Sequence, residues 1–239
     1  MPPRFRLIAK LMTNVKGISD VHVLVVDDED FMRSMIRRLL GVIGVGDISE
    51  AGDGADALSK LADVDPDIVI LDIMMEPMNG LKLLKAVRVG MSDAPADLPV
   101  IVLTGSADEA VLGTAMALDC DAFVRKNEEP DVIRQRIERT LATPREIREP
   151  EFYHGVRIPD ISIRVSAPSR AGDAGLPPAQ ARQVSVSEME IGDVLARDIV
   201  TADGHLLLAN GTEITTSYLN RLRDISEFVD FPDLWIRQQ

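Results

Sequence analysis

The sequence has few cysteines, few aromatic residues and a shortage of basic charge. Its single cysteine, Cys120, excludes an intrachain disulfide framework and a zinc site built from several cysteines. With 26 basic against 39 acidic residues, the net charge of −13 opposes broad nucleic-acid binding, which needs a basic face. No apolar run is long enough to span a bilayer, and the basic N-terminus lacks the apolar core of a signal peptide. We therefore expect a cytoplasmic protein that binds neither nucleic acid nor a membrane.

Hydrophobic residues, in contrast, make up 46% of the 239 residues, which is enough to form a buried core. From Val21 onward, short apolar runs alternate with amphipathic segments. The expected strands span 21–27, 47–51, 68–71, 98–105 and 121–126, and the expected helices span 30–43, 53–64, 80–89, 108–118 and 129–141. Runs without polar alternation suit strands that are buried on both faces. The pattern therefore predicts an α/β fold, a doubly wound sheet of five parallel strands covered by helices on both faces.

The composition changes after Leu141. Residues 143–184 are rich in Pro, Arg, Gly and Ala with little periodicity, and this predicts an extended linker. In residues 185–239, two strand-like runs flank the turn dipeptide Asp203-Gly204 and precede an expected helix (216–225) and a short strand (234–236). The expected organisation is an N-terminal extension (1–19), an α/β domain (20–142), the linker, and a small α+β C-terminal module.

Polar side chains stand where the expected strands end. Asp27 and Asp28 end the first strand and Asp72 ends the third, and these two strands are neighbours in a doubly wound sheet. Three carboxylates in one pocket repel each other unless a cation intervenes, and Mg²⁺ prefers oxygen ligands. Asp72 could then attack a phosphoryl group to form an acyl phosphate. Thr104 and Lys126 end the fourth and fifth strands and offer a hydroxyl and an ammonium to the phosphoryl oxygens. Helix-capping aspartates and an ordinary strand-end threonine are the alternatives.

The order and spacing of Asp27-Asp28, Asp72 followed by "MMEPMNG", Thr104-Gly105 and Lys126 resemble the receiver domain of two-component response regulators. This resemblance covers residues 20–142 and implies a flavodoxin-like fold with Asp72 as the phosphoacceptor. It also implies that Mg²⁺ is bound by Asp28, Asp72 and the backbone carbonyl of Met74, with Asp27 helping directly or through water. The expected activity is limited to self-catalysed phosphotransfer and slow autodephosphorylation, so the chain is not expected to be an enzyme otherwise.

The same resemblance bears on two further positions, one that matches the family pattern and one that departs from it. Phe123 occupies the place of an aromatic switch residue that moves with Thr104 on phosphorylation, although an ordinary core aromatic is the alternative. Asn127 follows Lys126, where the family usually has proline.

The expected phosphate donor is a cognate histidine kinase or phosphotransfer protein. The face formed by the fourth helix, fifth strand and fifth helix is the candidate surface for a second copy of the chain or an unidentified output protein.

Residues 185–239 resemble a small β-hairpin-and-helix module that often precedes HD-type phosphohydrolase domains. No His-Asp pair is present in the sequence, so the phosphohydrolase motif itself is absent. Residues 184–239 contain four arginines, no lysine and ten acidic residues, a net charge of −6, which argues against DNA-binding output. We therefore expect a phosphorylation-controlled protein interaction or dimerisation. The alternative is a regulatory subunit that acts in trans on a separate phosphohydrolase or kinase.

Overall fold

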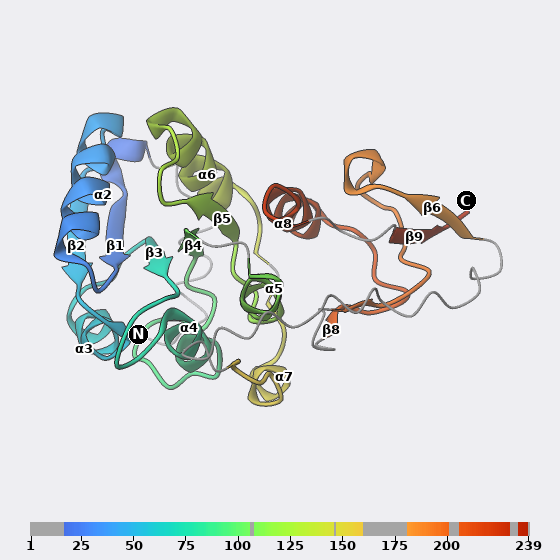
Figure 1. Cartoon of the computed structure of the whole chain (residues 1–239), viewed down its shortest axis with the longest axis horizontal. Coiled ribbons are helices and arrows are strands. Elements are labelled where there is room, and N and C mark those ends of the chain that lie inside the picture. The colour runs from blue at the N-terminus through green and yellow to red at the C-terminus, as the bar shows by residue number, and fades with distance from the viewer. Residues whose placement is uncertain are drawn as a thin grey trace, which may run out of the picture.

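The computed structural model describes residues 17–105, 108–145, 147–159, 181–200, 206–229 and 234–238. These residues form an α/β domain and a smaller C-terminal module that packs against one side of it (Figure 1). Most of the expected N-terminal extension, the Asp203-Gly204 turn and the middle of the expected linker lie outside the described residues.

The α/β domain is built on a five-stranded parallel sheet with the strand order β2-β1-β3-β4-β5. The strands are β1 (His22–Val26), β2 (Asp47–Ala51), β3 (Ile68–Asp72), β4 (Val100–Thr104) and β5 (Ala122–Arg125). Every residue of β3 and β4 is buried, because the central strands of a sheet covered on both faces have no solvent side. This order confirms the predicted doubly wound, flavodoxin-like fold, with β1 and β3 as neighbours.

Five helices cover the sheet, and they lie close to the expected positions. They are α2 (Asp30–Ile43), α3 (Gly54–Asp63), α4 (Gly80–Arg88), α5 (Glu109–Ala117) and α6 (Pro130–Ala142), preceded by a short 3₁₀ turn, η1 (Ile18–Asp20). One apolar cluster lies beneath α2 and α6, and a second lies beneath α3, α4 and α5. Side-chain caps fix several helix starts: Asp53, Asn79 and Asp108 each accept a backbone N–H from the first turn of the helix that follows.

The described part of the C-terminal module contains two small antiparallel sheets, one α-helix and a short 3₁₀ helix. Its elements are β6 (Ala181–Val184), η2 (Val186–Glu188), β7 (Ile199–Val200), β8 (Leu206–Leu208), α8 (Thr216–Ser226) and β9 (Leu234–Arg237). β6 pairs with β9, and β7 pairs with β8 across the expected turn. β6 lies at the end of the range that the composition assigns to a linker, so the described part of the module includes Ala181–Val184 together with residues beyond 185.

The first part of the expected linker is folded instead of extended. Residues 150–154 form a short helix, α7 (Pro150–His154), which packs beside α4. Tyr153 is fully buried, and the Lys85 ammonium donates a hydrogen bond to the carbonyl of Val156 at 2.8 Å. The Phe152-Tyr153 pair supplies the apolar surface that holds this segment, with the rings edge to face at 5.7 Å. The Pro- and Arg-rich composition concealed this contribution.

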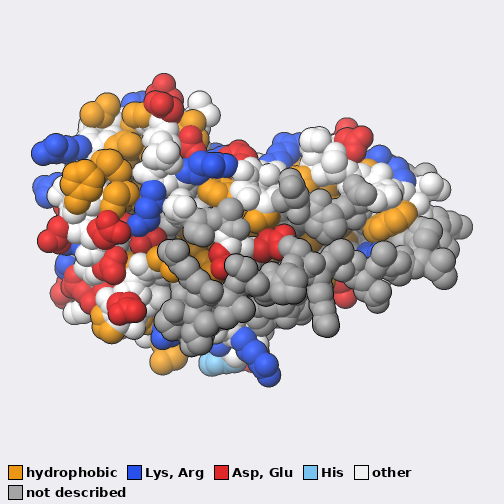
Figure 2. All heavy atoms as spheres, viewed as in Figure 1, with side chains coloured by type: hydrophobic (Ala, Val, Ile, Leu, Met, Phe, Trp, Pro, Cys, Tyr) orange, Lys and Arg blue, Asp and Glu red, His pale blue; other side chains and the backbone are white. Residues whose placement is uncertain are grey.

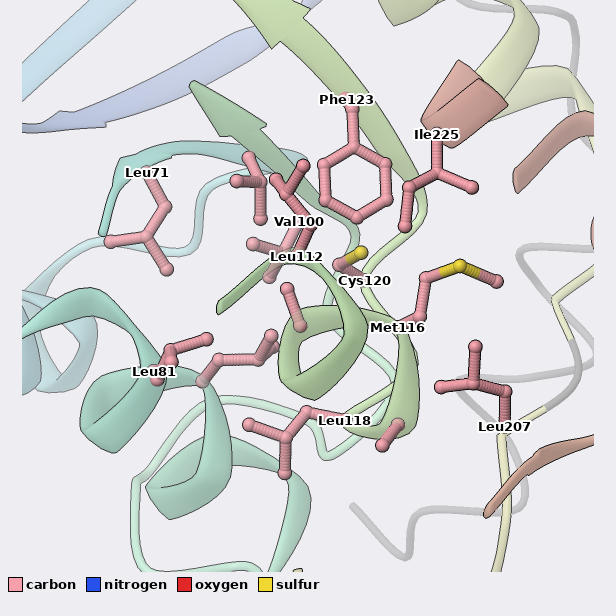
Figure 3. Close-up of a cluster of buried hydrophobic side chains, with 14 of the residues drawn as sticks. Leu71, Leu81, Val100, Leu112, Met116, Leu118, Cys120, Phe123, Leu207 and Ile225 are labelled. Atoms are coloured by element: carbon pink, nitrogen blue, oxygen red, sulfur yellow. The ribbon is translucent and has the colours of Figure 1, made fainter. Parts of the chain in front are cut away.

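The α5 helix explains why the module sits where it does. All residues from 111 to 117 are buried, and a helix that is apolar all round must be covered on both sides. The sheet covers one side and the module covers another, where Leu207 lies beside Met116 and Ile225 lies beside Phe123 (Figure 3). The face that the resemblance offers to a second copy or an output protein is therefore covered, at β5 and α5, by the chain's own C-terminal module.

Candidate functional site

Three aspartates meet at the carboxyl end of the sheet. Asp27 and Asp28 directly follow β1, and Asp72 is the last residue of β3, so the pairing of β1 with β3 brings them together. Carboxylate oxygens of all three lie within 4.8 Å of one another. Asp27 and Asp72 are buried, while Asp28 is exposed and opens the cluster to solvent. Acidic side chains gather over the part of the domain where β1 and β2 end (Figure 2). The sequence-based grouping of the three aspartates thus corresponds to one site in space.

Lys126 provides the positive charge of this site. Its ammonium donates to Asp27 Oδ2 at 2.9 Å and to Asp72 Oδ2 at 3.0 Å. The Lys126 backbone N–H donates to the Thr104 carbonyl at 3.1 Å, and the Glu128 N–H closes the following turn on the Arg125 carbonyl at 3.1 Å. The lysine therefore reaches both carboxylates although Asn127 stands in place of the family's usual proline.

Burial and charge shift the pKa values of the central pair. Burial raises the pKa of Asp72, and the neighbouring Asp27 carboxylate adds to this shift, against the opposing charge and hydrogen bond of Lys126. Burial by itself would lower the pKa of Lys126, but the hydrogen bond to Asp27 and the charge of Asp72 outweigh it, so that pKa is raised. The lysine therefore stays protonated at neutral pH. A further cation would stabilise the ionised form of the Asp72 carboxylate and so oppose the rise in its pKa.

The backbone around Asp72 is closely packed. A Cβ atom at Gly80 would come within 2.1 Å of the Asp72 carbonyl oxygen, so only glycine lets the start of α4 approach the end of β3 this closely. The Gly80 N–H donates to the Ile73 carbonyl at 3.1 Å. Glycine in the "MNG" segment therefore places the loop that follows Asp72.

The remaining expected site residues differ in how deeply they are buried and in which part of the molecule they face. Thr104 ends β4, is buried, and follows Leu103, which pairs in register with Asp72. Met74 is 45% exposed, so its thioether lies at the surface of the loop after Asp72. Phe123 is fully buried and faces the C-terminal module, with its ring centroid 6.2 Å from that of Phe228. Ser106, two residues after Thr104, lies outside the described residues.

The residues present fit a divalent cation. Three carboxylates supply hard oxygen ligands, and the exposed Asp28 leaves room for waters, which Mg²⁺ retains in protein sites. The Glu29 N–H donates to Asp27 Oδ1 at 2.9 Å and the Glu76 N–H donates to Asp28 Oδ2 at 3.3 Å, so two of the carboxylates are oriented by backbone. The cluster is thus an acidic pocket with oriented oxygens and one lysine at its edge.

Comparison with known proteins agrees with this geometry. A family model described as the response regulator receiver domain matches residues 23–138. The chemotaxis protein CheY1 of Helicobacter pylori is 36% identical over 123 residues, which make up 97% of that protein and 51% of this chain. The chain belongs to the response regulator receiver family. Receiver domains are generally phosphoacceptors that bind Mg²⁺ at an acidic pocket and interact with a histidine kinase or phosphotransfer protein.

Other relatives match the same half of the chain. A protein-glutamate methylesterase/protein-glutamine glutaminase of Myxococcus xanthus is 33% identical over 121 residues, covering 33% of that protein and 50% of this receiver chain. Among solved structures, the chemotaxis response regulator CheY4 of Vibrio cholerae is 27% identical, with a TM-score of 0.45 over 50% of this chain and 98% of that one. None of the helices that the structure describes has both the length and the apolar character required to cross a membrane.

The structure contains a buried polar cluster around Asp119 that was not predicted from the sequence. Asp119, just before β5, is buried with a left-handed backbone (φ 53°) and accepts hydrogen bonds from Tyr153, Arg148 and Arg221. The charge of Arg221 and the hydrogen bond of Arg148 outweigh burial and lower the pKa of Asp119. We call these four residues the Asp119 node. The partners of Asp119 come from the expected linker and from α8, which are distant in the sequence. The sequence signal for this node is limited to the stretch "REIREP", which lies just before the aromatic pair Phe152-Tyr153.

Proposed function

We propose that Asp72 is the phosphoacceptor and takes a phosphoryl group from the phosphohistidine of a histidine kinase or phosphotransfer protein. The observation that carries this proposal is the buried Asp72 carboxylate, 3.0 Å from the Lys126 ammonium and within 4.8 Å of two further carboxylates. Asp27, Asp28, Asp72 and the backbone carbonyl of Met74 would hold Mg²⁺, which supplies positive charge for the transferred group when bound.

In the reaction, an Asp72 oxygen forms a bond to phosphorus while the bond from phosphorus to the donor's imidazole nitrogen breaks. The electron pair of that bond stays with the departing imidazole. Lys126 and Thr104 would then bind phosphoryl oxygens, because an ammonium and a hydroxyl are the two donors at the ends of β4 and β5. The Asp72 carboxylate becomes an acyl phosphate, and the phosphoryl oxygens then carry the negative charge that Lys126 would pair with.

Labelling with acetyl phosphate or a phosphorylated kinase tests this assignment. Wild type should incorporate phosphate only with Mg²⁺, Asp72→Asn should incorporate none, and Asp28→Ala almost none. Asp97→Asn, which changes an exposed loop aspartate, is the matched control and should label as wild type does. Full labelling of Asp72→Asn would contradict the proposal.

We infer that the output is a protein interaction or dimerisation and not DNA binding. The C-terminal region carries a net charge of −6, and Arg221 of its one described helix is buried against Asp119 and is not available to a phosphate backbone. The resemblance of this region to the module that precedes HD-type phosphohydrolases supports the alternative, in which the chain regulates a separate signalling enzyme. Pull-downs with phosphorylated and unphosphorylated protein distinguish the two, because only the alternative requires an enzyme in the captured fraction.

A further inference from the structure

A network of ion pairs joins the α/β domain, the expected linker and the C-terminal module, and it contains more arginines than carboxylates. Each buried aspartate of this network is shared by two arginines: Asp119 by Arg148 and Arg221, Asp121 by Arg88 and Arg145, and Asp224 by Arg136 and Arg139. Arg136 also pairs with Glu227, which is 48% exposed. The described part of this network therefore carries an excess of positive charge, although the whole chain has a net charge of −13.

The arginines of this network are largely withdrawn from solvent. Their side chains are between 0% and 29% exposed. Burial lowers the pKa of Arg88 to about 10, and the charge of Arg145 adds to this shift, against the charges of Asp121 and Asp119. Buried charges are costly unless they are paired, and like charges that lie close together repel each other. The network thus favours the binding of a further anion.

A small pocket lies within this network, where α6, the segment after it and the first turns of α8 meet (Figure 1). Its lining includes Asp121, Arg139, Thr140, Arg145, Ser217 and Asn220. Its volume of about 10 Å³ is close to the space that one water-sized group needs. Arg139 and Asn220 are partly exposed, so the pocket can be reached from solvent.

Two buried polar groups of this pocket lack a partner. Within the part of the chain that the structure describes, Arg145 Nη1 and Thr140 Oγ1 make no hydrogen bond. Thr140 is 6% exposed, and the Arg145 side chain is 12% exposed. The other two nitrogens of Arg145, Nε and Nη2, donate to the Asp121 carboxylate at 2.7 Å each. Because buried polar groups in proteins are nearly always hydrogen-bonded, these two donors indicate that an acceptor belongs in the pocket.

The C-terminal module adds polar groups to the same pocket. Ser217 and Asn220 lie one turn apart on α8, and Ser217 is in the first turn, where backbone N–H groups favour negative charge. The oxygens of Asp121 already accept from Arg145 and, at 2.8 Å, from the Val100 N–H. A water molecule would accept hydrogen bonds here but would leave the excess charge unbalanced. An oxyanion does both, because its oxygens accept several hydrogen bonds and pair with guanidinium groups.

We propose that this pocket binds a small inorganic oxyanion of the phosphate class, which bridges α6 and the segment after it to α8. One oxygen of the anion would occupy the hollow beside Arg145 and Thr140, and the others would face Arg139 and the polar side chains of α8. None of these residues belongs to the acidic site, so the anion site and the phosphoacceptor site are separate. The bound anion would hold the C-terminal module on the α/β domain.

Titration calorimetry of the full chain with inorganic phosphate tests this proposal. The buffer contains EDTA, so that the three carboxylates of the acidic site hold no divalent ion and repel an anion, and chloride keeps the ionic strength constant. Wild type should bind a single phosphate per chain. Asn220→Asp and Thr140→Val should bind phosphate at least about tenfold more weakly, because the first adds a repelling charge and the second removes a hydrogen bond to a charged group. Asn210→Asp adds the same charge at an exposed position of the module and, as the matched control, should bind as wild type does.

Urea unfolding followed by the fluorescence of Trp235 on β9 gives a readout that a merely structural role would not produce. Asn220→Asp supplies the missing negative charge within the chain, so in phosphate-free buffer its unfolding midpoint should lie above that of wild type. Phosphate should then raise the midpoint of wild type more than that of Asn220→Asp, because only wild type binds it in the pocket. Phosphate also stabilises proteins in general through exclusion from their surface, and Asn210→Asp measures this background together with binding.

Three results would overturn the proposal. The first is absence of phosphate binding by wild type. The second is equal affinity in wild type and both pocket variants, which would mean an adventitious ion only, bound elsewhere. The third is a lower unfolding midpoint of Asn220→Asp than of wild type in phosphate-free buffer, because the pocket would then lack an excess of positive charge.

Discussion

Replacing Asp119 by asparagine removes the central charge of the node that attaches the C-terminal module. Asparagine has nearly the same size and tolerates the left-handed backbone at this position, where φ is 53°, so the change isolates the charge from the backbone geometry. Wild-type Asp119 is 1% exposed and accepts from Tyr153 at 2.6 Å, from Arg148 at 3.0 Å and from Arg221 at 2.6 Å.

The expected cost follows from what the substitution leaves behind. Breaking a buried ion pair by removing one partner typically costs about 3–5 kcal/mol, because the other charge stays buried without its counterion. Arg221 is 1% exposed and would lose the carboxylate that it bonds to. Since the asparagine oxygen can still accept one of the hydrogen bonds, we expect the lower end, about 3 kcal/mol. A single domain is stable by about 5–15 kcal/mol, so this loss should weaken the module substantially.

Urea unfolding provides the assay, followed by the fluorescence of Trp235, the chain's single tryptophan, which lies on β9 of the module. The Asp119→Asn midpoint should fall clearly below that of wild type, whereas exposed Asp97→Asn should shift stability by no more than about 0.5 kcal/mol. A loss of less than about 1 kcal/mol in Asp119→Asn would refute the reasoning, because it would mean that the buried charge is not needed.

The pH dependence supplies an internal check on the same substitution. The pKa of Asp119 is lowered in the folded chain, so the stability it contributes is present above about pH 3.9 and is lost as pH falls through the folded value. The difference between wild type and Asp119→Asn should therefore narrow below about pH 4. A constant difference across this range would contradict the assignment of the effect to charge.

Three further predictions concern the acidic site. Burial raises the pKa of Asp72, so the stability linked to this group is complete below about pH 3.9 and is lost as pH rises through the folded value. Asp72→Asn should therefore have a higher melting temperature than wild type at pH 7 in calorimetry. Adding Mg²⁺ should raise the melting temperature of wild type and leave that of Asp72→Asn unchanged. Gly80→Ala places a Cβ 2.1 Å from the Asp72 carbonyl and should cost about 3 kcal/mol, whereas Gly41→Ala meets nothing within 4 Å and should stabilise α2 by about 0.5–1 kcal/mol. Met74→Asn should speed loss of phosphate from labelled protein after the donor is removed, because an amide can hold the hydrolytic water and a thioether is a weak acceptor; wild-type decay within seconds, or an unchanged rate in the variant, would contradict this.

The sequence predicted the α/β domain well because its elements carry local signals. The short apolar run before Asp72 is typical of a strand buried on both faces, and capping residues such as Asp53 and Asn79 mark where helices begin. Once the strand order is known, the carboxyl ends of β1 and β3 must meet, so the grouping of the three aspartates followed from topology.

The position of the C-terminal module could not be predicted in the same way. Contacts such as Arg221 with Asp119, or Phe228 with Phe123, join residues about a hundred positions apart with no periodic pattern between them. The α7 helix has five residues, too few for a helical period to show. One signal was present: α5 reads "EAVLGTAMA" with no polar face, which predicts a cover on its outer side but not which segment provides it.

The central claim is that Asp72 is the residue that carries the phosphoryl group. Labelled wild-type protein can be treated with borohydride, which reduces an acyl phosphate to the alcohol, and then mapped by peptide mass spectrometry. The account predicts homoserine at position 72 and unmodified aspartate at Asp27 and Asp28. Modification at either of those two residues, with Asp72 unchanged, would contradict it.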